Sequence, residues 1–317
     1  MPSNTQIIIN QFGAAELLAF QESELPQPQA GEVLIKVAFA AVNPIDVKTR
    51  AGLGWAAQHN KNNLPWSPGY DVSGSVIKQG SGSQKFNLND TVSGFIGFPL
   101  RAGGYSQYIC VPETELALMP EDISLECAAA IPLAGQTAAQ ALEKAKIQPK
   151  EKVLILAGAG GVGHIATQIA VAAKTEVYAT CSSDNIDYVN GLGATAIDYN
   201  LQGWQGNLND VDVLIDLVGG DNALNALSCL RPGSRVVTVP TITSSIVCAK
   251  ASELGFIGMG MLVEPNITQL EELLHLISAG MLKIKIEQIF PYQDVVAAHR
   301  KVEKGHARGK ILLNMQS

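Results

Sequence analysis

The stretch VLILAGAGGVGHIATQIAVAA, residues 153–173, decides the fold of this chain. It contains no Asp, Glu, Lys or Arg, and about 20 apolar residues are enough to cross a bilayer. Its internal order nevertheless favours a strand, a turn and a helix. Residues 153–156 are an aliphatic run typical of a buried strand. Glycines follow, and then apolar residues recur at helical spacing at Ile165, Ile169 and Ala172.

The turn between these two elements matches the pattern Gly-x-Gly-x-x-Gly at Gly158, Gly160 and Gly163. Between a strand and a helix this pattern is typical of a dinucleotide site. Gly158 permits the tight turn, Gly160 removes a Cβ that would block the pyrophosphate, and Gly163 lets the helix pack closely on the strand. The free amides and the dipole at the helix N-terminus then favour phosphate. The alternative is a glycine-rich turn that serves packing alone.

The residues after the next predicted strand, 176–180, indicate which dinucleotide is bound. Enzymes that use NAD place an acid about 20 residues after the glycines, where it holds the ribose hydroxyls. Here that count reaches Ser183, which follows Cys181 and Ser182. Because hydroxyls can donate to a 2′-phosphate and an acid would repel it, NADPH is favoured. Asp184 leaves NADH open, and the serines can also cap the next helix.

Composition narrows the class of protein. A chain of 317 residues suggests about two domains, and 47% hydrophobic residues supply a sizeable core. The net charge of −7 argues against nucleic-acid binding. The beginning of the chain lacks the features of a secretory signal, and five scattered cysteines without a Cys-x-x-Cys pair indicate no disulfide framework. We therefore expect a cytoplasmic protein that does not bind membranes.

The chain changes character along its length. After residue 193, predicted strands and helices alternate through residue 239, which indicates a doubly wound parallel sheet. Residues 268–271, TQLE, predict a capping box at the start of a helix that ends at Gly280. About the first 110 residues instead contain short strands punctuated by Gly, Pro and Asn, and GKILL (309–313) predicts a strand.

Five segments carry a family resemblance, in order: AAVNPIDVKTRAG (40–52), PGYDVSGSV (68–76), AAAIPLAGQTAAQAL (128–142), AGAGGVG (157–163) and ARGKILL (307–313). With these segments the chain resembles the zinc-free quinone oxidoreductase (zeta-crystallin-like) branch of the medium-chain dehydrogenase/reductase superfamily. The resemblance implies an α/β protein. A GroES-like β-rich substrate domain, residues 1–120 completed by the tail 289–317, accompanies a Rossmann NADP-binding domain with a doubly wound parallel sheet, residues 121–288. It also implies an active site in the cleft between the domains and a homodimer.

The resemblance also bears on metal. Where zinc-dependent members of the superfamily hold catalytic zinc, this sequence has Asn43, Tyr70, Asp71 and Leu133. Only Asp71 is a usual ligand, and a catalytic zinc needs three protein ligands. We therefore expect no metal. Without a Lewis acid, the remaining chemistry is hydride transfer to a substrate that is already electrophilic, such as a quinone or an α,β-unsaturated carbonyl.

Three residues are the catalytic candidates that the resemblance implies. Asn43 would donate to the carbonyl oxygen on which charge grows, or it is simply a turn residue before a proline. Lys48 stands where zeta-crystallin-like members carry Tyr, and it would steady an enolate or donate a proton, or it faces solvent. Tyr70 lines the substrate cleft or packs in the interior. Asp46 orders the loop, or it pairs with Lys48 or Arg50.

The cofactor-binding candidates fall into groups along the chain. They comprise the segment expected near the nicotinamide, the glycine turn, the end of the next strand, a tyrosine expected near the adenosine phosphate, the end of a later strand, and a lysine in the tail. In that order they are Gln136, Thr137; Gly158, Gly160, Gly161, Val162, Gly163; Cys181, Ser182, Ser183; Tyr199; Val218, Gly219; and Lys310. His164 is interpreted as a histidine on the helix surface.

The predicted function is an NADPH-dependent reductase that transfers hydride to a quinone or an α,β-unsaturated carbonyl without metal. Two alternatives stay open. One is an enoyl-thioester reductase, for which residues 53–68, with Trp55 and Trp66, would form a lid. The other is a non-catalytic NADPH-binding sensor or structural protein. The sequence does not indicate the physiological acceptor, or whether one electron or two are transferred.

Overall fold

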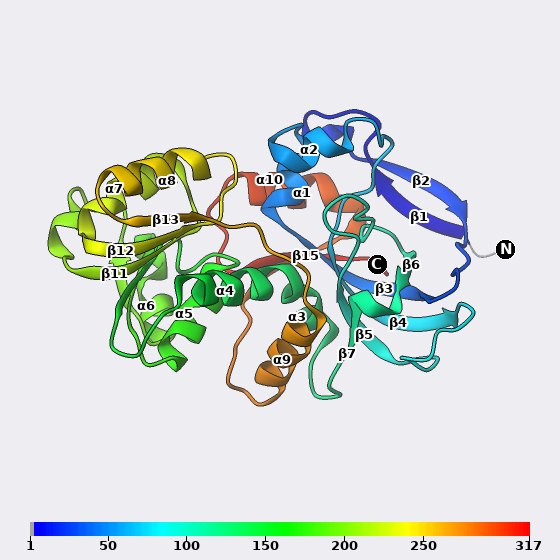
Figure 1. Cartoon of the computed structure of the whole chain (residues 1–317). Coiled ribbons are helices and arrows are strands. Elements are labelled where there is room, and N and C mark those ends of the chain that lie inside the picture. Colours follow the sequence, from blue (N-terminus) through cyan, green and yellow to red (C-terminus); the bar gives the residue numbers. More distant parts are fainter. Residues whose placement is uncertain (1–2) are drawn as a thin grey trace. The chain divides into compact units, whose positions relative to one another are not determined.

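The computed structural model describes residues 3–317, and the chain divides into two compact units (Figure 1). The first unit runs to Gln136 and resumes with Pro265–Ser317, and the second is Thr137–Glu264. The sequence placed these boundaries after residues 120 and 288. Residues 121–136 and 265–288 therefore fall in the first unit, and so does the tail from residue 289, which was expected there.

The first unit is built on two sheets. β1 (Ser3–Ile8) and β2 (Ala19–Glu24) form an antiparallel pair. The other sheet has seven strands in the order β14-β15-β3-β4-β5-β7, with β6 pairing to β3. These strands are β3 (Glu32–Val42), β4 (Asp71–Gln79), β5 (Thr91–Phe95), β6 (Tyr108–Pro112), β7 (Leu116–Leu118), β14 (Ile286–Pro291) and β15 (Lys310–Asn314).

Short helices follow the strands of the first unit. They are α1 (Pro44–Arg50), α2 (Gly54–Asn60), α3 (Leu125–Ala130), α9 (Ile267–Ser278) and α10 (Val295–Glu303), with 3₁₀ turns η1 (Ala15–Leu17), η2 (Glu113–Glu115) and η6 (Tyr292–Asp294). α4 (Pro132–Ala145) begins in the first unit and continues in the second. The predicted capping box at residues 268–271 is wrong, because Asn266 caps α9 by accepting from the amide of Gln269. Gly280, with φ +69°, follows the helix as predicted.

The pairing of β3 with its two neighbouring strands determines which residues lie close to its carboxyl end. On one side Ala41 lies opposite Asp71, the first residue of β4. On the other side Val42 lies opposite Ile311, next to the first residue of β15. The residue after β3, Asn43, is therefore placed between the starts of two strands that are far from it in sequence.

The second unit is a parallel sheet of six strands in the order β10-β9-β8-β11-β12-β13. The strands are β8 (Lys152–Ile155), β9 (Glu176–Cys181), β10 (Thr195–Asp198), β11 (Val211–Asp216), β12 (Leu230–Thr238) and β13 (Ile257–Gly260). The helical segments are α5 (Gly163–Ala172), α6 (Ile186–Gly191), α7 (Gly220–Ala226), α8 (Ser244–Glu253), η3 (Ser183–Asn185), η4 (Trp204–Asn207) and η5 (Leu227–Cys229). The predicted parallel sheet is confirmed, and the order of its strands is that of the Rossmann fold.

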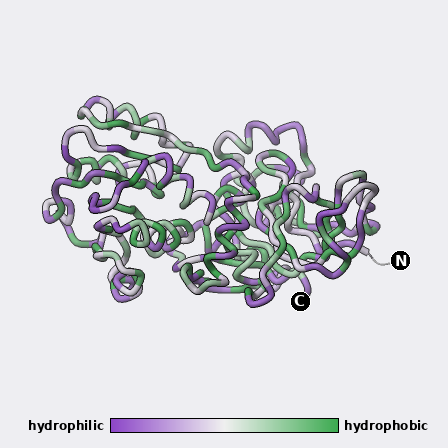
Figure 2. Tube along the Cα trace, turned by 60° about the horizontal axis from the view of Figure 1, so that its bottom comes forward, coloured by the Kyte–Doolittle hydropathy of each residue, from purple (hydrophilic) through white to green (hydrophobic). Residues whose placement is uncertain are grey.

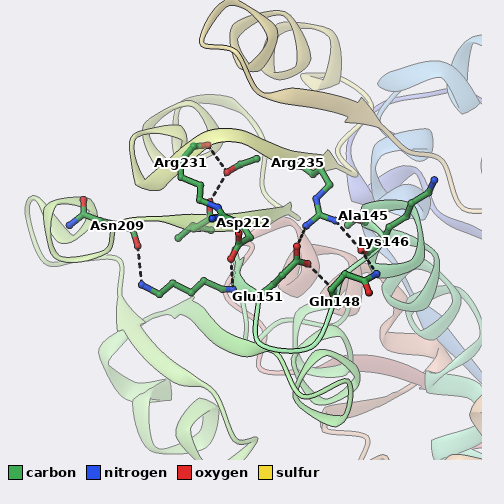
Figure 3. A network of polar contacts seen from close by, with 11 residues as sticks. Ala145, Lys146, Gln148, Glu151, Asn209, Asp212, Arg231 and Arg235 are labelled. Carbon is green, nitrogen blue, oxygen red and sulfur yellow. Dashed lines mark hydrogen bonds and ion pairs between the residues drawn. The ribbon is translucent and has the colours of Figure 1, made fainter.

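A polar network ties the amino-terminal edge of this sheet together (Figure 3). The guanidinium of Arg235 donates to the carbonyl oxygens of Ala145 and Lys146, both at 2.9 Å, and pairs with Glu151. Asp212 accepts from the amide at the start of β8 and pairs with Arg231. The opposite, carboxyl-terminal edge is the one at which ligands bind in open parallel sheets.

Hydrophobic residues are distributed over many short elements. Along the chain the colour in Figure 2 changes between green and purple over short lengths. Among residues 3–317, no helix has both the length and the apolar character that a bilayer span requires.

Candidate functional site

The glycine turn between β8 and α5 is held by the neighbouring strand β9. The amide of Ala157 donates to Thr180 Oγ1 at 3.0 Å, and the amide of Gly158 donates to the carbonyl oxygen of Thr180 at 2.7 Å. A Cβ on Gly158 would lie 2.5 Å from the Cβ of Ala179, and one on Gly163 would lie 2.0 Å from the carbonyl oxygen of Ala157. These two glycines are therefore required by close packing within the turn.

Gly160 differs from the other two. A Cβ there would have only Ala157 within 4 Å, with the carbonyl oxygen at 3.2 Å. Apart from Ala157 and the immediate chain neighbours, no protein atom lies within 4 Å of this position, which leaves room beside Gly160 for a pyrophosphate. In the described part of the chain, the amides of Gly161 and Val162 donate to no protein acceptor. The start of α5 therefore has the free donors and the positive dipole end that bind phosphate groups, and these residues fit a dinucleotide.

His164 was expected on the helix surface, and this prediction is wrong. The side chain is fully buried, and its Nδ1 lies 2.8 Å from the carbonyl oxygen of Gly160. Because a carbonyl only accepts, Nδ1 carries the hydrogen. The imidazole therefore stabilises the glycine turn from inside the unit, and the position of His164 next to the glycines was the only indication of this in the sequence.

The carboxyl end of β9 carries the candidates for the adenosine end of the cofactor. Cys181 is buried, and its carbonyl oxygen accepts from the amide of Tyr199 at 3.0 Å, which fixes the spacing of β9 and β10. Ser182 Oγ accepts from the side chain of Asn185 at 2.8 Å, so its own hydrogen can still be donated. Ser183 and Asp184 are exposed. No Lys or Arg occurs between residues 174 and 231, so this segment offers hydroxyl and amide donors rather than a cation.

The end of β11 lies beside the glycine turn, because β11 and β8 are neighbours in the sheet. Asp216 is buried, and its Oδ1 accepts from the amides of Val218 at 2.9 Å and Gly219 at 2.7 Å. Its Oδ2 accepts from Thr238 Oγ1 at 2.6 Å. Asp216 thus shapes the turn that presents Val218, which is 43% exposed. Sequence reasoning missed this carboxylate, although an Asp that ends an apolar run three residues before a glycine was a usable signal.

Gln136 and Thr137 lie on α4, where the chain passes from the first unit to the second. Both side chains are buried. Gln136 Oε1 accepts from the amide of Asn266 at 2.6 Å, so its side chain joins α4 to the start of α9. The expected contact of these two residues with a nicotinamide stays a prediction.

A buried polar cluster of Asn43, Asp46, Asp71 and Lys310 occupies the first unit. Asn43 Nδ2 donates to Asp71 Oδ2 at 2.9 Å, and Asn43 Oδ1 accepts from Lys310 Nζ. Lys310 Nζ also lies 3.5 Å from Asp71 Oδ2. Asp71 Oδ1 accepts from the amide of Leu133 at 2.8 Å. The structure thus brings Asn43 and Lys310 together, which are 267 residues apart in the chain.

Asp46 belongs to the same cluster but makes different bonds. Its Oδ2 accepts from the amide of Asn43 and its Oδ1 from the amide of Gly69, both at 2.9 Å. The proposed pairing with Lys48 or Arg50 is wrong, since Arg50 pairs with Glu303. The alternative, that Asp46 orders the loop, is confirmed.

Burial sets the protonation chemistry of the cluster. It raises the pKa of Asp46 to about 7, against the two backbone hydrogen bonds. It also raises the pKa of Asp71, where Lys310 acts in the opposite direction. The pKa of Lys310 is lowered by burial, and the nearby Asp71 and Asp46 counter that effect. The three ionisable groups therefore depend on one another for their charge.

Of the three catalytic candidates, Lys48 is the only one whose side chain is not fully buried. It lies on α1 and is half-buried, and its side-chain ammonium has no hydrogen bond or ion pair to any residue from 3 to 317. Burial lowers its pKa. A cation of this kind is able to stabilise a growing negative charge or to release a proton.

Tyr70 is fully buried, and its hydroxyl donates to the carbonyl oxygen of Pro99 at 2.9 Å. Its ring stacks edge-on against Phe98, with centroids 5.3 Å apart, and against Phe95 at 6.4 Å. Burial raises the pKa of its hydroxyl. These contacts agree with the alternative in which Tyr70 packs in the interior.

Comparison with known proteins gives matches over the whole chain. Residues 29–121 match the alcohol dehydrogenase GroES-like domain, and residues 192–313 match the zinc-binding dehydrogenase family. A 2-methylene-furan-3-one reductase of Solanum lycopersicum is 33% identical over 96% of this chain and 77% of its own length. An NADPH-dependent alkenal/one oxidoreductase of Arabidopsis thaliana is 31% identical over 96% and 78%.

Two solved structures of quinone oxidoreductases are similar to this chain over nearly its full length. The quinone oxidoreductase from Coxiella burnetii has a TM-score of 0.95 and 39% identity, and the match covers 99% of each chain. The Escherichia coli quinone oxidoreductase complexed with NADPH has a TM-score of 0.86 and 27% identity, and the match covers 98% of this chain and 99% of the other.

The residues of this chain do not fit a zinc ion. The carboxylate of Asp71 is fully engaged by Asn43, Lys310 and the amide of Leu133, and it has no second carboxylate, thiolate or imidazole beside it in the cluster except the separately bonded Asp46. In residues 3–317, no group of three or more His, Cys, Asp or Glu is arranged to hold a metal.

Proposed function

Because the chain belongs to the zinc-free quinone oxidoreductase branch of the medium-chain dehydrogenase/reductase superfamily, we propose that it is an NADPH-dependent reductase of quinones or α,β-unsaturated carbonyls. One observation carries this proposal most directly. Gly160 has room beside it, and the amides of Gly161 and Val162 donate to no acceptor of the described chain, at the carboxyl-terminal edge of a Rossmann sheet, which supports binding of a phosphate there.

The second unit would hold the cofactor. The turn from Gly158 to Gly163 would bind the pyrophosphate, with its amides donating to the phosphate oxygens. Ser182, Ser183 and Tyr199 would receive the 2′-phosphate, and Cys181 would support them from β9. Val218 and Gly219 would border the dinucleotide, and Gln136 with Thr137 would contact the nicotinamide half. When bound, NADPH supplies the hydride.

The first unit would supply the groups that act on the acceptor. Hydride addition to the β-carbon of an enone moves an electron pair onto the carbonyl oxygen, and a proton must then reach the α-carbon. For a quinone, the hydride and one proton give the hydroquinone. Lys48 would stabilise the developing oxygen anion and supply the proton, and Asn43 would donate the Nδ2 hydrogen that Asp71 does not use. Tyr70 stays a proposed lining residue, and its contacts favour packing.

Turnover with a panel of acceptors tests this function. Loss of NADPH absorbance would be followed with small quinones, linear enones and an enoyl thioester. We expect reduction of quinones or enones, and at least a tenfold lower kcat in K48M, since a positioned general acid contributes about 10²–10⁴-fold. The matched control is K61M, which alters an exposed lysine after α2. Tight NADPH binding without turnover of any acceptor would instead support the non-catalytic role, and turnover of the thioester alone would support the enoyl reductase.

We also propose a cytoplasmic homodimer. The support for the dimer is β13, an edge strand of the six-stranded sheet that pairs with β12 alone among the described strands and carries Ile257, which is 54% exposed. Two copies of such an edge can pair about a two-fold axis. Sedimentation of the wild-type protein as a monomer at micromolar concentration would contradict the dimer, and I257K should dissociate it. Cell fractionation tests the location.

A further inference from the structure

Lys310 was expected near the cofactor, yet its ammonium is buried and directed at two side chains of the first unit. We infer that Lys310 is a positioning residue, which together with Asp71 fixes the carboxamide of Asn43 and through it the first turn of α1. This inference rests on the proposed function, because α1 carries Lys48 and begins directly after Asn43.

The two partners leave the carboxamide of Asn43 only one orientation. An ammonium only donates and a carboxylate only accepts. With Lys310 on one side and Asp71 on the other, Oδ1 must face the lysine and Nδ2 must face the aspartate. A flipped amide would place a donor against a donor and an acceptor against an acceptor. The second Nδ2 hydrogen therefore has a fixed direction.

The same contacts anchor the start of α1 to several elements. Asn43 follows β3, Asp71 opens β4, Lys310 opens β15, and the amide that holds Asp71 from the other side comes from α4. α1 has seven residues, so Lys48 is little more than one turn from this anchor. A change in the orientation of Asn43 would therefore shift the first turn of α1 and, with it, the position of Lys48.

The burial of Lys310 supports an indirect role. The residue is 3% exposed, and its ammonium already has a carbonyl oxygen and a carboxylate as partners. Removing Lys310 alone would leave Asp71 as an unpaired buried charge, which is strongly destabilising. A test must therefore remove both charges together.

The central experiment compares wild type with D71N/K310M, in which Asn at position 71 can still accept from the amide of Leu133. We expect NADPH Kd, measured by calorimetry, to change less than about twofold, and kcat to fall about tenfold or more, the scale of one lost charge-assisted hydrogen bond. Adding N43A to this variant should lower kcat little further, since coupled residues are not additive. K310R, which keeps the charge, should retain most of the activity. K36M, an exposed lysine on β3, is the control and should behave as wild type.

Two kinetic outcomes would overturn the inference. If NADPH Kd rises more than about tenfold while kcat at saturation is unchanged, Lys310 is a cofactor ligand. If N43A and D71N/K310M multiply in their effects on kcat, the residues act independently.

An NMR measurement keeps the inference separate from the proposed function. The side-chain NH₂ resonances of Asn43, identified by their loss in N43A, should exchange slowly with solvent in wild type and at least tenfold faster in D71N/K310M. Equal exchange in the two proteins would refute the positioning role even if no acceptor is ever turned over. Absence of turnover in wild type would count against the proposed function alone.

Discussion

The contribution of His299, a residue of the first unit outside the proposed site, to folding stability should fall on acidification. His299 lies on α10, is fully buried, and has both ring nitrogens without a hydrogen-bond partner among the described residues. The ring of Tyr105 meets it edge-on at 5.7 Å, and the guanidinium of Arg50, paired with Glu303, is the charge that faces it. Burial, aided by Arg50, lowers the pKa of His299 from 6.5 to about 3.

The sign of the effect follows from proton counting. Above pH 6.5 the imidazole is neutral in both states and contributes no pH dependence. Between pH 6.5 and 3 the unfolded chain binds a proton at His299 that the folded chain excludes, so the stability contribution falls with pH. The slope is about 1.4 kcal/mol per pH unit for one proton. At pH 5 the cost is about 2 kcal/mol, since 6.5 − 5 is 1.5 units.

Urea unfolding of wild type and H299L between about pH 7.5 and 5 measures this cost. Over this range the pH dependence of the two proteins should differ only by the proton that His299 binds in the unfolded chain. Trp55 and Trp66 report on the first unit by fluorescence. At pH 7.5, H299L should be about as stable as wild type or more so, since it removes two unpaired buried nitrogens. At pH 5 the variant should gain about 2 kcal/mol relative to wild type. H275L, which alters an exposed histidine on α9, is the control. Parallel curves for wild type and H299L would show that His299 is not kept neutral by the fold.

Three further outcomes are expected. G160V should weaken NADPH binding by more than about tenfold and lower the melting temperature less than a change at Gly158 or Gly163, because the added side chain meets only Ala157 and extends into the proposed phosphate site; calorimetry and thermal melting together check this. S182A/S183A should weaken binding of NADPH but not of NADH, by about 5- to 30-fold if one or two hydrogen bonds to the 2′-phosphate are lost, and equal losses for the two coenzymes would contradict it. R235M should lower the free energy of unfolding of the second unit by about 1–3 kcal/mol, because two backbone carbonyls and Glu151 lose their donor, while kcat is unchanged.

Local patterns in the sequence were enough to predict the Rossmann unit. The glycine pattern at Gly158, Gly160 and Gly163 and the strand and helix on either side of it are contiguous in the chain, so predicting this turn needed no long-range information. The capping error at Thr268 has a local cause as well. Asn266, two residues earlier, has a short acceptor side chain and an extended backbone, and it takes the cap first.

The buried polar cluster lay beyond such patterns. Asn43, Asp71 and Lys310 meet because β3 pairs with β4 on one side and β15 on the other, and no periodicity in the sequence specifies that register. Lys310 alone, in a basic tail motif, was therefore assigned to the cofactor. The burial of His164 could not be predicted from local patterns either. Whether a polar residue on a helix faces solvent depends on which other elements cover that helix.

Two of the buried titratable groups of the first unit, Asp46 and His299, act on stability with opposite signs. The pKa of Asp46 is raised from 3.8 to about 7, so the contribution of Asp46 is fully present below pH 3.8 and is lost as the pH rises toward 7. His299 costs stability as the pH falls from 6.5 toward 3. Between pH 4 and 6.5 the folded unit thus holds a proton on Asp46 and excludes one from His299, and the two slopes of about 1.4 kcal/mol per unit offset each other. Because H299L removes only one of them, that variant should become more stable on acidification through this range while wild type changes little from these two groups, and a flat curve for H299L would show that Asp46 is ionised inside the fold.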